Sequence, residues 1–486
     1  MDIVNESLPT FKDIEKIIFS YVCSAAVEMV KNLLEGYDRK LMVERDRKAY
    51  RHKGIKTNHI RCVFGDVAYK RTVYEHVNEE GKKEFVYLLD DAMGMEVIGK
   101  MSYNSVEAMV KAATEVSFRK AASAVNLTSQ INISSQGIWN TVQKFGKKLE
   151  AEETDMAKRL EEDKPQIGKE VPVLFEEADG IFLHLQKPYR PKEASGKEIK
   201  VSTAYEGIRK GKDGRNEVVG KVMTAGFEEA KEFHRIREAM IQTKYNTDEV
   251  KYRFINGDGA AWVKHPYDPD TIYQLDRFHV FKKIIYSIAD TAMRKELKAL
   301  YMDGKTEELL AKIDAYANSV ASNEKEDKRE EKARALYSYL LNNKAGIKAY
   351  FDMKEQLPKP PGGLLYGSMG TQESQNCSVI TLRMKHHKGS WSIPGAGRMA
   401  KILTRLENKT FYTALERYTS LIDRELVVFA KDILSAAAIP RVVGKGKKDG
   451  NIRKGHWAMA DAKMTGSRKS LLRAFGYREF SEIAHI

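Results

Sequence analysis

Cysteine is scarce in this chain of 486 residues: there are three, Cys23, Cys62 and Cys377, and they lie far apart. An odd, scattered set matches neither a metal-binding spacing nor a disulfide framework, so we expect a protein of a reducing compartment. The N-terminus lacks the apolar core of a signal peptide, and no stretch approaches the length expected of a membrane span. These absences predict a soluble intracellular protein without a membrane partner.

Acidic residues are outnumbered by basic ones. The chain has 68 Asp and Glu residues against 82 Lys and Arg residues, a net charge of +14 and a pI near 9.2. A basic surplus does not specify a fold, but it favours polyanions such as nucleic acid as partners. A merely basic cytosolic enzyme remains the alternative. The length is sufficient for several hydrophobic cores, so the sequence predicts a multidomain protein.

The first hundred residues change from a helical to a strand pattern. Apolar residues recur at helical spacing over residues 10–48, which predicts one long amphipathic helix. Alternating residues over 60–74, and an apolar run over 85–89 after a turn at 78–81, predict a small three-stranded β unit.

The next segment is typical of three short helices. They are expected over residues 105–116, from Ser117 onward, and from a serine-capped start near Ser134. This arrangement resembles a helix-turn-helix unit, in which Gln136 and Asn140 on the last helix would contact DNA. A plain three-helix unit with Trp139 in its core is the alternative.

From Val171 the pattern predicts an α/β core. Residues 171–179 and 180–186 are expected to form a hairpin that turns at Asp179-Gly180, followed by a third strand over 200–205. A helix over 228–243 precedes a fourth strand that ends near Asp258, and a fifth strand is expected over 271–275. Three strands, a helix and a further strand, with acids on the first and fourth strands, form a ribonuclease H-like arrangement. The Lys-, Glu- and Ala-rich stretch 290–355 is expected to be a helical insertion.

Three acidic residues are the candidate ligands of a divalent cation. Asp179 and Asp258 lie at or near strand ends, and Glu373 opens a helix-like stretch after a Gly-Ser-Met-Gly turn. Carboxylate oxygens are the ligands that Mg²⁺ prefers, and two such ions can activate a water or hydroxyl for phosphodiester chemistry. Glu177 shares the strand face of Asp179 and competes with it for the role of ligand. Asp276 and His279, three residues apart after the fifth strand, could support the site; a capped helix start is the alternative.

A dense basic block follows the third acid. The block carries a tryptophan that could stack on an unpaired base, while its cations could hold the DNA backbone. Its candidate DNA-binding residues are Arg383, Lys385, His386, His387, Lys388 and Trp391.

The chain is similar to the insertion-sequence transposases of the ISLre (type two) family, formerly classed as an uncharacterised protein family, and more remotely to Mutator-like DDE transposases. The resemblance spans nearly the whole length. It rests on the segments VPVLFEEADGIFLHLQ, INGDGAAW, QLDRFHVFKK, DRKAYRHKGIKTNHIRCVFGDVAYKRTVY and GTQESQNCSVITLRMKHHKGSWSIPGAGRMAKIL.

The resemblance implies an Asp-Asp-Glu triad at Asp179, Asp258 and Glu373, and an Asp-x-x-His signature at Asp276 and His279. It also implies two Mg²⁺ (or Mn²⁺) ions per active site. The expected function is DDE-type strand cleavage and strand transfer at the terminal inverted repeats of the element and at target DNA, by a homodimer or larger assembly. An inert transposase-derived DNA-binding protein and a ribonuclease H-like nuclease are the alternatives.

The expected organisation combines α+β and α/β parts in six segments along the chain. These are an N-terminal helix and β-hairpin domain (1–100), a helix-turn-helix-like module (101–168), the first part of a ribonuclease H-like core (169–289), a helical insertion (290–363), the second part of the core with the third acid (364–435) and a basic C-terminal arm (436–486).

Overall fold

The structure is a computed structural model of a mixed α/β protein, in which residues up to Val427 form one compact unit and Val428–Ile486 form a second. It describes residues 10–94, 100–162, 168–187, 196–212, 214–321, 327–370, 376–385, 389–419 and 424–436. The predicted segment boundaries stay predictions. Within the first unit, however, several predicted segments share one hydrophobic core.

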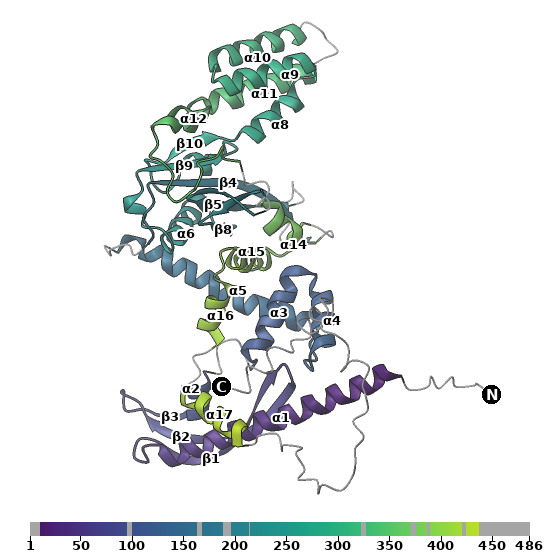
Figure 1. Cartoon of the computed structure of the whole chain (residues 1–486), viewed down its shortest axis with the longest axis vertical. Helices are drawn as coiled ribbons and strands as arrows, with labels where there is room; N and C mark the ends of the chain where they lie inside the picture. The colour runs from purple at the N-terminus through teal and green to yellow at the C-terminus, as the bar shows by residue number, and fades with distance from the viewer. Residues whose placement is uncertain are drawn as a thin grey trace, which may run out of the picture. The chain divides into compact units, whose positions relative to one another are not determined.

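The N-terminal part consists of a long helix on a small antiparallel sheet (Figure 1). Near the C-terminal end of the helix, Asp38 accepts hydrogen bonds from the backbone N–H and the hydroxyl of Thr72 on the second strand, which anchors the helix to the sheet. The elements are α1 (Phe11–Glu44), β1 (Arg51–Cys62), β2 (Gly65–Val77), β3 (Lys83–Val86) and α2 (Leu88–Met93). The expected helix and hairpin are present, although the first strand begins nine residues earlier than predicted.

Helix α1 corrects one expectation. By length and composition it could cross a membrane, and it is the one helix in the described part of the chain that passes this test. The expectation that no stretch approaches such a length is therefore wrong. A single helix of this kind near the N-terminus is weak evidence of a membrane span.

Three helices follow the β unit and pack into the same core as the central sheet. They are α3 (Tyr103–Glu115), α4 (Phe118–Thr128) and α5 (Ser135–Lys158). Serine side chains cap each of them by accepting a backbone N–H: Ser102, Ser117 and Ser134. Val110, Val125 and Phe145 from these helices belong to one buried cluster together with Ile181 and Val201 of the central sheet. The helical unit is therefore part of the body that carries the sheet.

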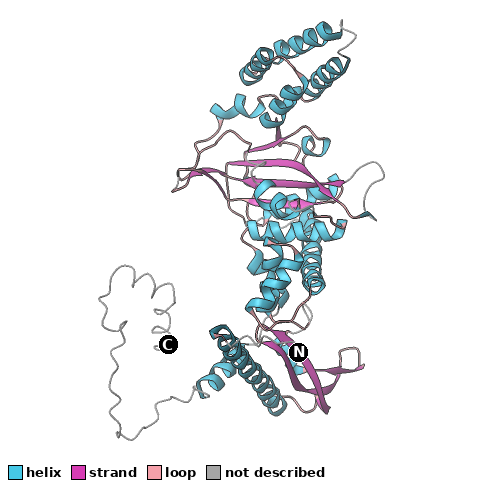
Figure 2. Cartoon of the chain, turned by 90° about the vertical axis from the view of Figure 1, so that its right-hand side faces the viewer, coloured by secondary structure: helices cyan, strands magenta, loops and turns pink. Residues whose placement is uncertain are grey.

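The central sheet has five strands in the order β10-β9-β4-β5-β8. Strands β4, β5 and β8 are antiparallel neighbours, whereas β9 and β10 run parallel to β4 (Figures 1 and 2). Helix α6 covers one face of the sheet and helix α15 the other. The elements are β4 (Val173–His184), β5 (Gly196–Tyr205), β8 (Val222–Gly226), α6 (Ala230–Gln242), β9 (Tyr252–Gly257), α7 (Ala261–Lys264), β10 (Ile272–Leu275) and a separate pair, β6 (Gly207–Lys210) and β7 (Asn216–Val219).

Strand β4 runs straight through the predicted turn. Asp179 and Gly180 pair with Val201 and Lys200 of β5 in an unbroken antiparallel ladder, so the expected hairpin at this point is wrong. The Asp-Gly turn preference is weak compared with ten consecutive cross-strand pairs. Gly180 leaves room for a neighbour on β5: a Cβ there would lie 1.7 Å from Glu198 Oε1, so a larger residue would make that side chain move. The β4–β5 connection comes after His184 instead.

The stretch 290–355, predicted to be helical, consists mainly of helices in its described part. Its helices form a separate buried cluster that includes Leu297, Ile313 and Leu336 and reaches Leu275 at the end of β10. They are α9 (Thr291–Asp303), α10 (Thr306–Ala321), α11 (Asp327–Asn342) and α12 (Ala349–Met353), preceded by α8 (Arg277–Ser287).

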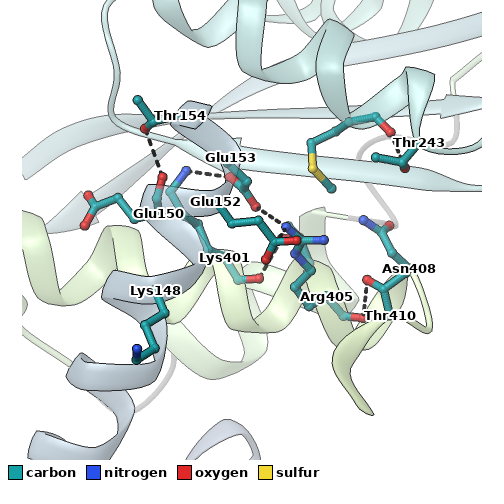
Figure 3. Close-up of polar contacts among 12 residues, drawn as sticks. Lys148, Glu150, Glu152, Glu153, Thr154, Thr243, Lys401, Arg405, Asn408 and Thr410 are labelled. Carbon is teal, nitrogen blue, oxygen red and sulfur yellow. Dashed lines mark hydrogen bonds and ion pairs between the residues drawn. The ribbon is translucent and has the colours of Figure 1, made fainter. Parts of the chain in front are cut away.

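The chain then returns to the sheet through a short π-helix (Asn376–Thr381), α14 (Leu382–Met384) and α15 (Ile393–Glu407). Two further helices follow, α16 (Phe411–Thr419) and α17 (Arg424–Ala436). Buried charges join α15 to α5 (Figure 3). Lys401 Nζ lies 2.8 Å from Glu153 Oε2 and 2.9 Å from Glu228 Oε1, and Arg405 lies beside Glu152 and Glu153. Because each charge has partners of opposite sign, the network avoids the cost of burying an isolated ion.

His234 on α6 predicts an acid sensitivity of the fold. The ring is buried near Trp262, and burial, reinforced by the charge of Arg237, lowers its pKa to about 4. An unfolded histidine titrates near 6.5, so between these values the unfolded chain binds a proton that the folded chain excludes. Stability from this group is therefore present above about pH 6.5 and falls as the pH drops towards 4.

We expect urea unfolding of the wild-type protein to lose on the order of 1–2 kcal/mol more between pH 7 and pH 5 than that of His234→Gln. An equal loss in both proteins would show that His234 is solvated enough to titrate normally.

Candidate active site at the ends of two parallel strands

Asp179 and Asp258 lie next to each other on neighbouring strands. In the parallel ladder of β4 and β9 the last registered pair is Ala178 with Gly257, and each aspartate is the residue that follows. Neighbouring strands are about 4.8 Å apart, so the two aspartates lie side by side at this end of β9. Asp179 is 9% exposed. It is at the point where β4 extends beyond β9 and pairs only with β5.

Backbone groups hold both aspartates in place. Asp179 Oδ1 accepts the N–H of Gly180 at 2.8 Å, and Asp258 Oδ1 accepts the N–H of Ala260 at 2.9 Å. The hydroxyl of Tyr339, on α11, donates to the carbonyl of Asp258 at 2.8 Å. The helical insertion therefore supports the loop that carries the second aspartate.

Asp276 and His279 join this site, as the Asp-x-x-His spacing predicts. Asp276 caps α8: its Oδ2 accepts the backbone N–H of His279 at 3.1 Å and lies 2.8 Å from Nδ1 of the same ring. Asn256 Nδ2 donates to Asp276 Oδ1 at 3.0 Å. The other ring nitrogen, Nε2, lies 3.8 Å from Asp179 Oδ1. The histidine is thus both the capped helix start and a neighbour of the first aspartate.

The interactions between Asp276 and His279 shift the pKa values of the two side chains in opposite directions. The hydrogen bond to Asp276 raises the pKa of His279, against the effect of burial, and the charges of Asp179 and Asp258 raise it further. Burial opposes ionisation of Asp276, but the hydrogen bonds from His279 and Asn256 outweigh it and lower the pKa of Asp276. The site therefore favours a protonated imidazole between carboxylates.

Glu177 is fully buried on the same face as Asp179. It pairs in register with Asn256 of β9, and its Oε1 accepts the hydroxyl of Tyr205 at 2.6 Å. A buried carboxylate already held by a tyrosine suits a supporting position beside Asp179.

Glu198 is an acid that the sequence reasoning missed. It is on β5, and its carboxyl group lies against Gly180 of β4, next to Asp179. Burial raises its pKa, and the negative charge of Asp258 raises it further. Glu198 reaches the site only through the pairing register of β4 with β5. Because the sequence pattern predicts a turn at Asp179-Gly180, it does not predict this register.

Several predicted site residues lie outside the described residues: Glu373, His386, His387 and Lys388. Within the described part of the chain, no group of three or more His, Cys, Asp or Glu side chains is arranged to hold a metal ion. The described structure thus contributes two adjacent carboxylates, Asp179 and Asp258, and the third predicted ligand remains a prediction.

The basic block differs from the expected exposed DNA contact. Trp391 is only 6% exposed and its indole N–H donates to the carbonyl of Met384 at 2.9 Å, so its face is not free to stack on a base. The guanidinium of Arg383 lies against the rings of Phe118 and Trp391 and donates to the carbonyl of Ala113. Lys385 is exposed. Arg383 and Trp391 are inward-facing because the segment folds back onto α3 and α4.

Gln136 and Asn140 are exposed on the first turns of α5, where Gln136 Nε2 donates to Asn140 Oδ1 at 3.0 Å. Trp139, between them, is partly buried rather than enclosed in the core. The alternative of a core tryptophan is therefore wrong, and the two polar side chains remain available for contact.

Comparison with known proteins identifies relatives over most of the chain. The model of the Uncharacterised protein family (UPF0236) matches residues 5–419. A UPF0236 protein of Caldanaerobacter subterraneus subsp. tengcongensis is 26% identical over 77% of this chain and 73% of its own length. A UPF0236 protein from the vanSb 3′ region of Streptococcus gallolyticus is 24% identical over 82% and 83%.

Among solved structures, the Drosophila P element transposase strand transfer complex aligns with 68% of this chain and 86% of its own, at 10% identity and a TM-score of 0.20. A similarity at this level carries no structural argument.

Proposed function

The chain belongs to the Uncharacterised protein family (UPF0236), and we propose that it is a DDE-type transposase that cuts and joins DNA at the ends of its own insertion sequence. The observation that carries the proposal is the pair Asp179 and Asp258 on adjacent parallel strands, with His279 beside Asp179. Two carboxylates held side by side, one within β4 and one directly after β9, are the part of a phosphodiester-cleaving site that a fold must place accurately.

The topology supports the same proposal. Three antiparallel strands, β4, β5 and β8, are followed by helix α6 and then by the parallel strand β9. This is the order expected of a ribonuclease H-like core, and the two aspartates are on the first and fourth strands of the sheet. The helices α8–α12 follow the fifth strand and lie between the second aspartate and Glu373 in the sequence, and α9–α12 fall within the proposed helical insertion (290–363).

Asp179 and Asp258, completed by Glu373, are the proposed ligands of two Mg²⁺ or Mn²⁺ ions. The fit rests on donor chemistry: both described side chains present carboxylate oxygens, which hard divalent cations prefer. Bound ions would lower the pKa of an attacking water or 3′-hydroxyl and stabilise the departing oxygen. Asp276 would orient His279, whose Nε2 side faces Asp179 and can hold a proton or a phosphate oxygen there.

The proposed substrates are the terminal inverted repeats of the element and a target duplex. The net charge of +14 supports a polyanionic partner. Because cutting and joining bring two element ends together, we propose a homodimer or larger assembly acting on cytoplasmic, nucleoid-associated DNA.

The metal requirement is the first test of the function. With element-end DNA, Mg²⁺ or Mn²⁺ should support strand cleavage, whereas Ca²⁺ should allow DNA binding with little or no cleavage. The assay should use the full chain, because α3–α5 share a buried core with the sheet. Full cleavage in the presence of a chelator would contradict the proposal. Binding without cleavage in every metal would indicate an inert DNA-binding protein.

A further inference from the structure

A cavity of about 460 Å³ opens where the basic block meets the first turns of α4 and α5. It is distinct from the aspartate site and is formed by four segments of the chain: the starts of α4 and α5, the residue Gln186 after β4, and residues 383 and 389–392. Its walls combine aromatic rings, one cation and small polar groups, among them Phe118, Ser135, Trp139, Gln186, Arg383 and Trp391. A volume of this size matches small organic ligands or one nucleotide.

Arg383 is the unusual member of the cavity wall. Burial lowers its pKa to about 10. Its Nε donates to the carbonyl of Ala113, but its Nη2 is buried without a hydrogen-bond partner. Among the described residues no carboxylate forms an ion pair with it, in contrast to Arg253, Lys401 and Arg405. The Arg383 side chain is partly buried, and a cation taken partly out of water gains from an opposite charge, so an anionic ligand in the cavity would complete its contacts.

Two further features of the cavity fit a phosphate bound to a base. Ser135 is the first residue of α5, and the start of a helix of this length favours negative charge. Trp139, one turn further along α5, is a partly exposed ring of the cavity, as is Phe118, whereas Trp391 is buried beside Arg383. Of these rings, Trp139 is the one on the helix whose start favours the anion. An indole face next to an anion site is suited to stacking on a nucleobase.

We propose that this cavity binds one unpaired nucleotide of a DNA strand, with its phosphate held by Arg383 and the start of α5 and its base stacked on Trp139. The inference rests on the proposed DNA-cleaving function and adds to it a subsite for single-stranded DNA. It also replaces the sequence-based expectation that Trp391 stacks on an end base.

Strand β4 connects this subsite to the aspartates. Gln186, in the cavity wall, follows β4, and its backbone N–H donates to the carbonyl of Trp391 at 2.9 Å. Asp179 is seven residues earlier on the same strand, or roughly 20 Å away at the rise of an extended chain. One DNA strand of several nucleotides can therefore reach both places.

The test measures binding of the full-length protein, in Ca²⁺, to a labelled duplex that is either blunt or carries a tail of a few unpaired thymidines. We expect the tailed duplex to bind about tenfold more tightly, the effect of stacking one base. Trp139→Ala should abolish this preference, and Trp139→Phe should retain most of it.

Ser135 provides a matched pair that spares the fold. Ser135→Asp adds a negative charge at a helix start, where it does not destabilise the helix, yet it should repel the phosphate. We expect it to lower tailed-duplex affinity several-fold without changing blunt-duplex affinity, whereas the neutral Ser135→Asn should behave like wild type.

Equal affinity of the wild type for tailed and blunt DNA would overturn the inference, as would a tail preference that survives both Trp139→Ala and Ser135→Asp. Competition by inorganic phosphate as strong as that by thymidine monophosphate would reduce the cavity to an anion site and also overturn it. The outcome is separate from that of the proposed function, because tail preference is measured without cleavage, and metal-dependent cleavage is scored on element-end DNA.

Discussion

Replacing Asp179 or Asp258 by asparagine is expected to reduce strand cleavage by orders of magnitude while leaving the protein folded and bound to element-end DNA. The two substitutions are nearly isosteric, so packing around β4 and β9 is kept. What is lost is one negative charge and one oxygen ligand, which divalent metal binding requires. Cleavage of labelled element-end DNA in Mg²⁺, measured beside DNA affinity in Ca²⁺, separates the two effects.

Stability should move in the opposite direction to activity. Burial raises the pKa of Glu198 and the negative charge of Asp258 raises it further, as expected of like charges placed close together. Removing one charge relieves that repulsion, so the free energy of unfolding without metal should be equal to or slightly above that of wild type. Urea unfolding in a chelator measures this directly.

Glu177→Gln is the matched control on the same strand face. Its carboxylate is buried and accepts a hydrogen bond from Tyr205, so we expect it to position Asp179 rather than bind metal, and its loss to lower cleavage about 10–100-fold. Comparable losses at Glu177 and Asp179 would mean that Glu177 is the ligand. A Glu373→Gln protein that still cuts would place the third ligand elsewhere, with Glu198 as the next carboxylate to replace.

The parts of the fold that depend on local pattern could be predicted from the sequence. Helix α6 was expected over 228–243 and occurs at Ala230–Gln242, and β10 was expected over 271–275 and occurs at Ile272–Leu275. In both cases apolar periodicity and flanking residues decide the element. Strand β8 was not predicted, because its five buried residues form a short apolar run without alternation.

The residues of the candidate site could be predicted only where the order of strands and helices along the chain was enough to bring them together. Asp179, Asp258, Asp276 and His279 could be proposed together because strand ends of an α/β sheet converge. Glu198 and the nucleotide cavity could not be. Glu198 depends on a cross-strand register, and Arg383 meets Phe118 across 265 residues of chain, a contact that no local pattern encodes.

The largest loss of stability is expected on removing a buried charge from β9, the strand that precedes Asp258. Arg253, on β9, lies 2.5 Å from Glu176 through Nε and 2.5 Å from Glu238 through Nη2. Arg237 shares Glu176 at 3.2 Å, and all four side chains are nearly inaccessible to solvent. Arg253→Met keeps the apolar stem but leaves two buried carboxylates with one cation, so we expect the free energy of unfolding to fall by about 3–5 kcal/mol.

The control is an arginine with a similar partner on the surface. Arg334 pairs with Glu330 one turn away on α11 and is about half exposed, so Arg334→Met should cost less than about 0.5 kcal/mol. Restoring charge balance in the core, by combining Arg253→Met with Glu238→Gln, should recover part of the loss, because Glu176 then keeps Arg237 and no unpaired carboxylate remains. If Arg253→Met lowers the free energy of unfolding no more than Arg334→Met does, the buried ion pairs do not hold β9 in the sheet. The position of Asp258 must then depend on the hydrogen bond between its carbonyl and Tyr339.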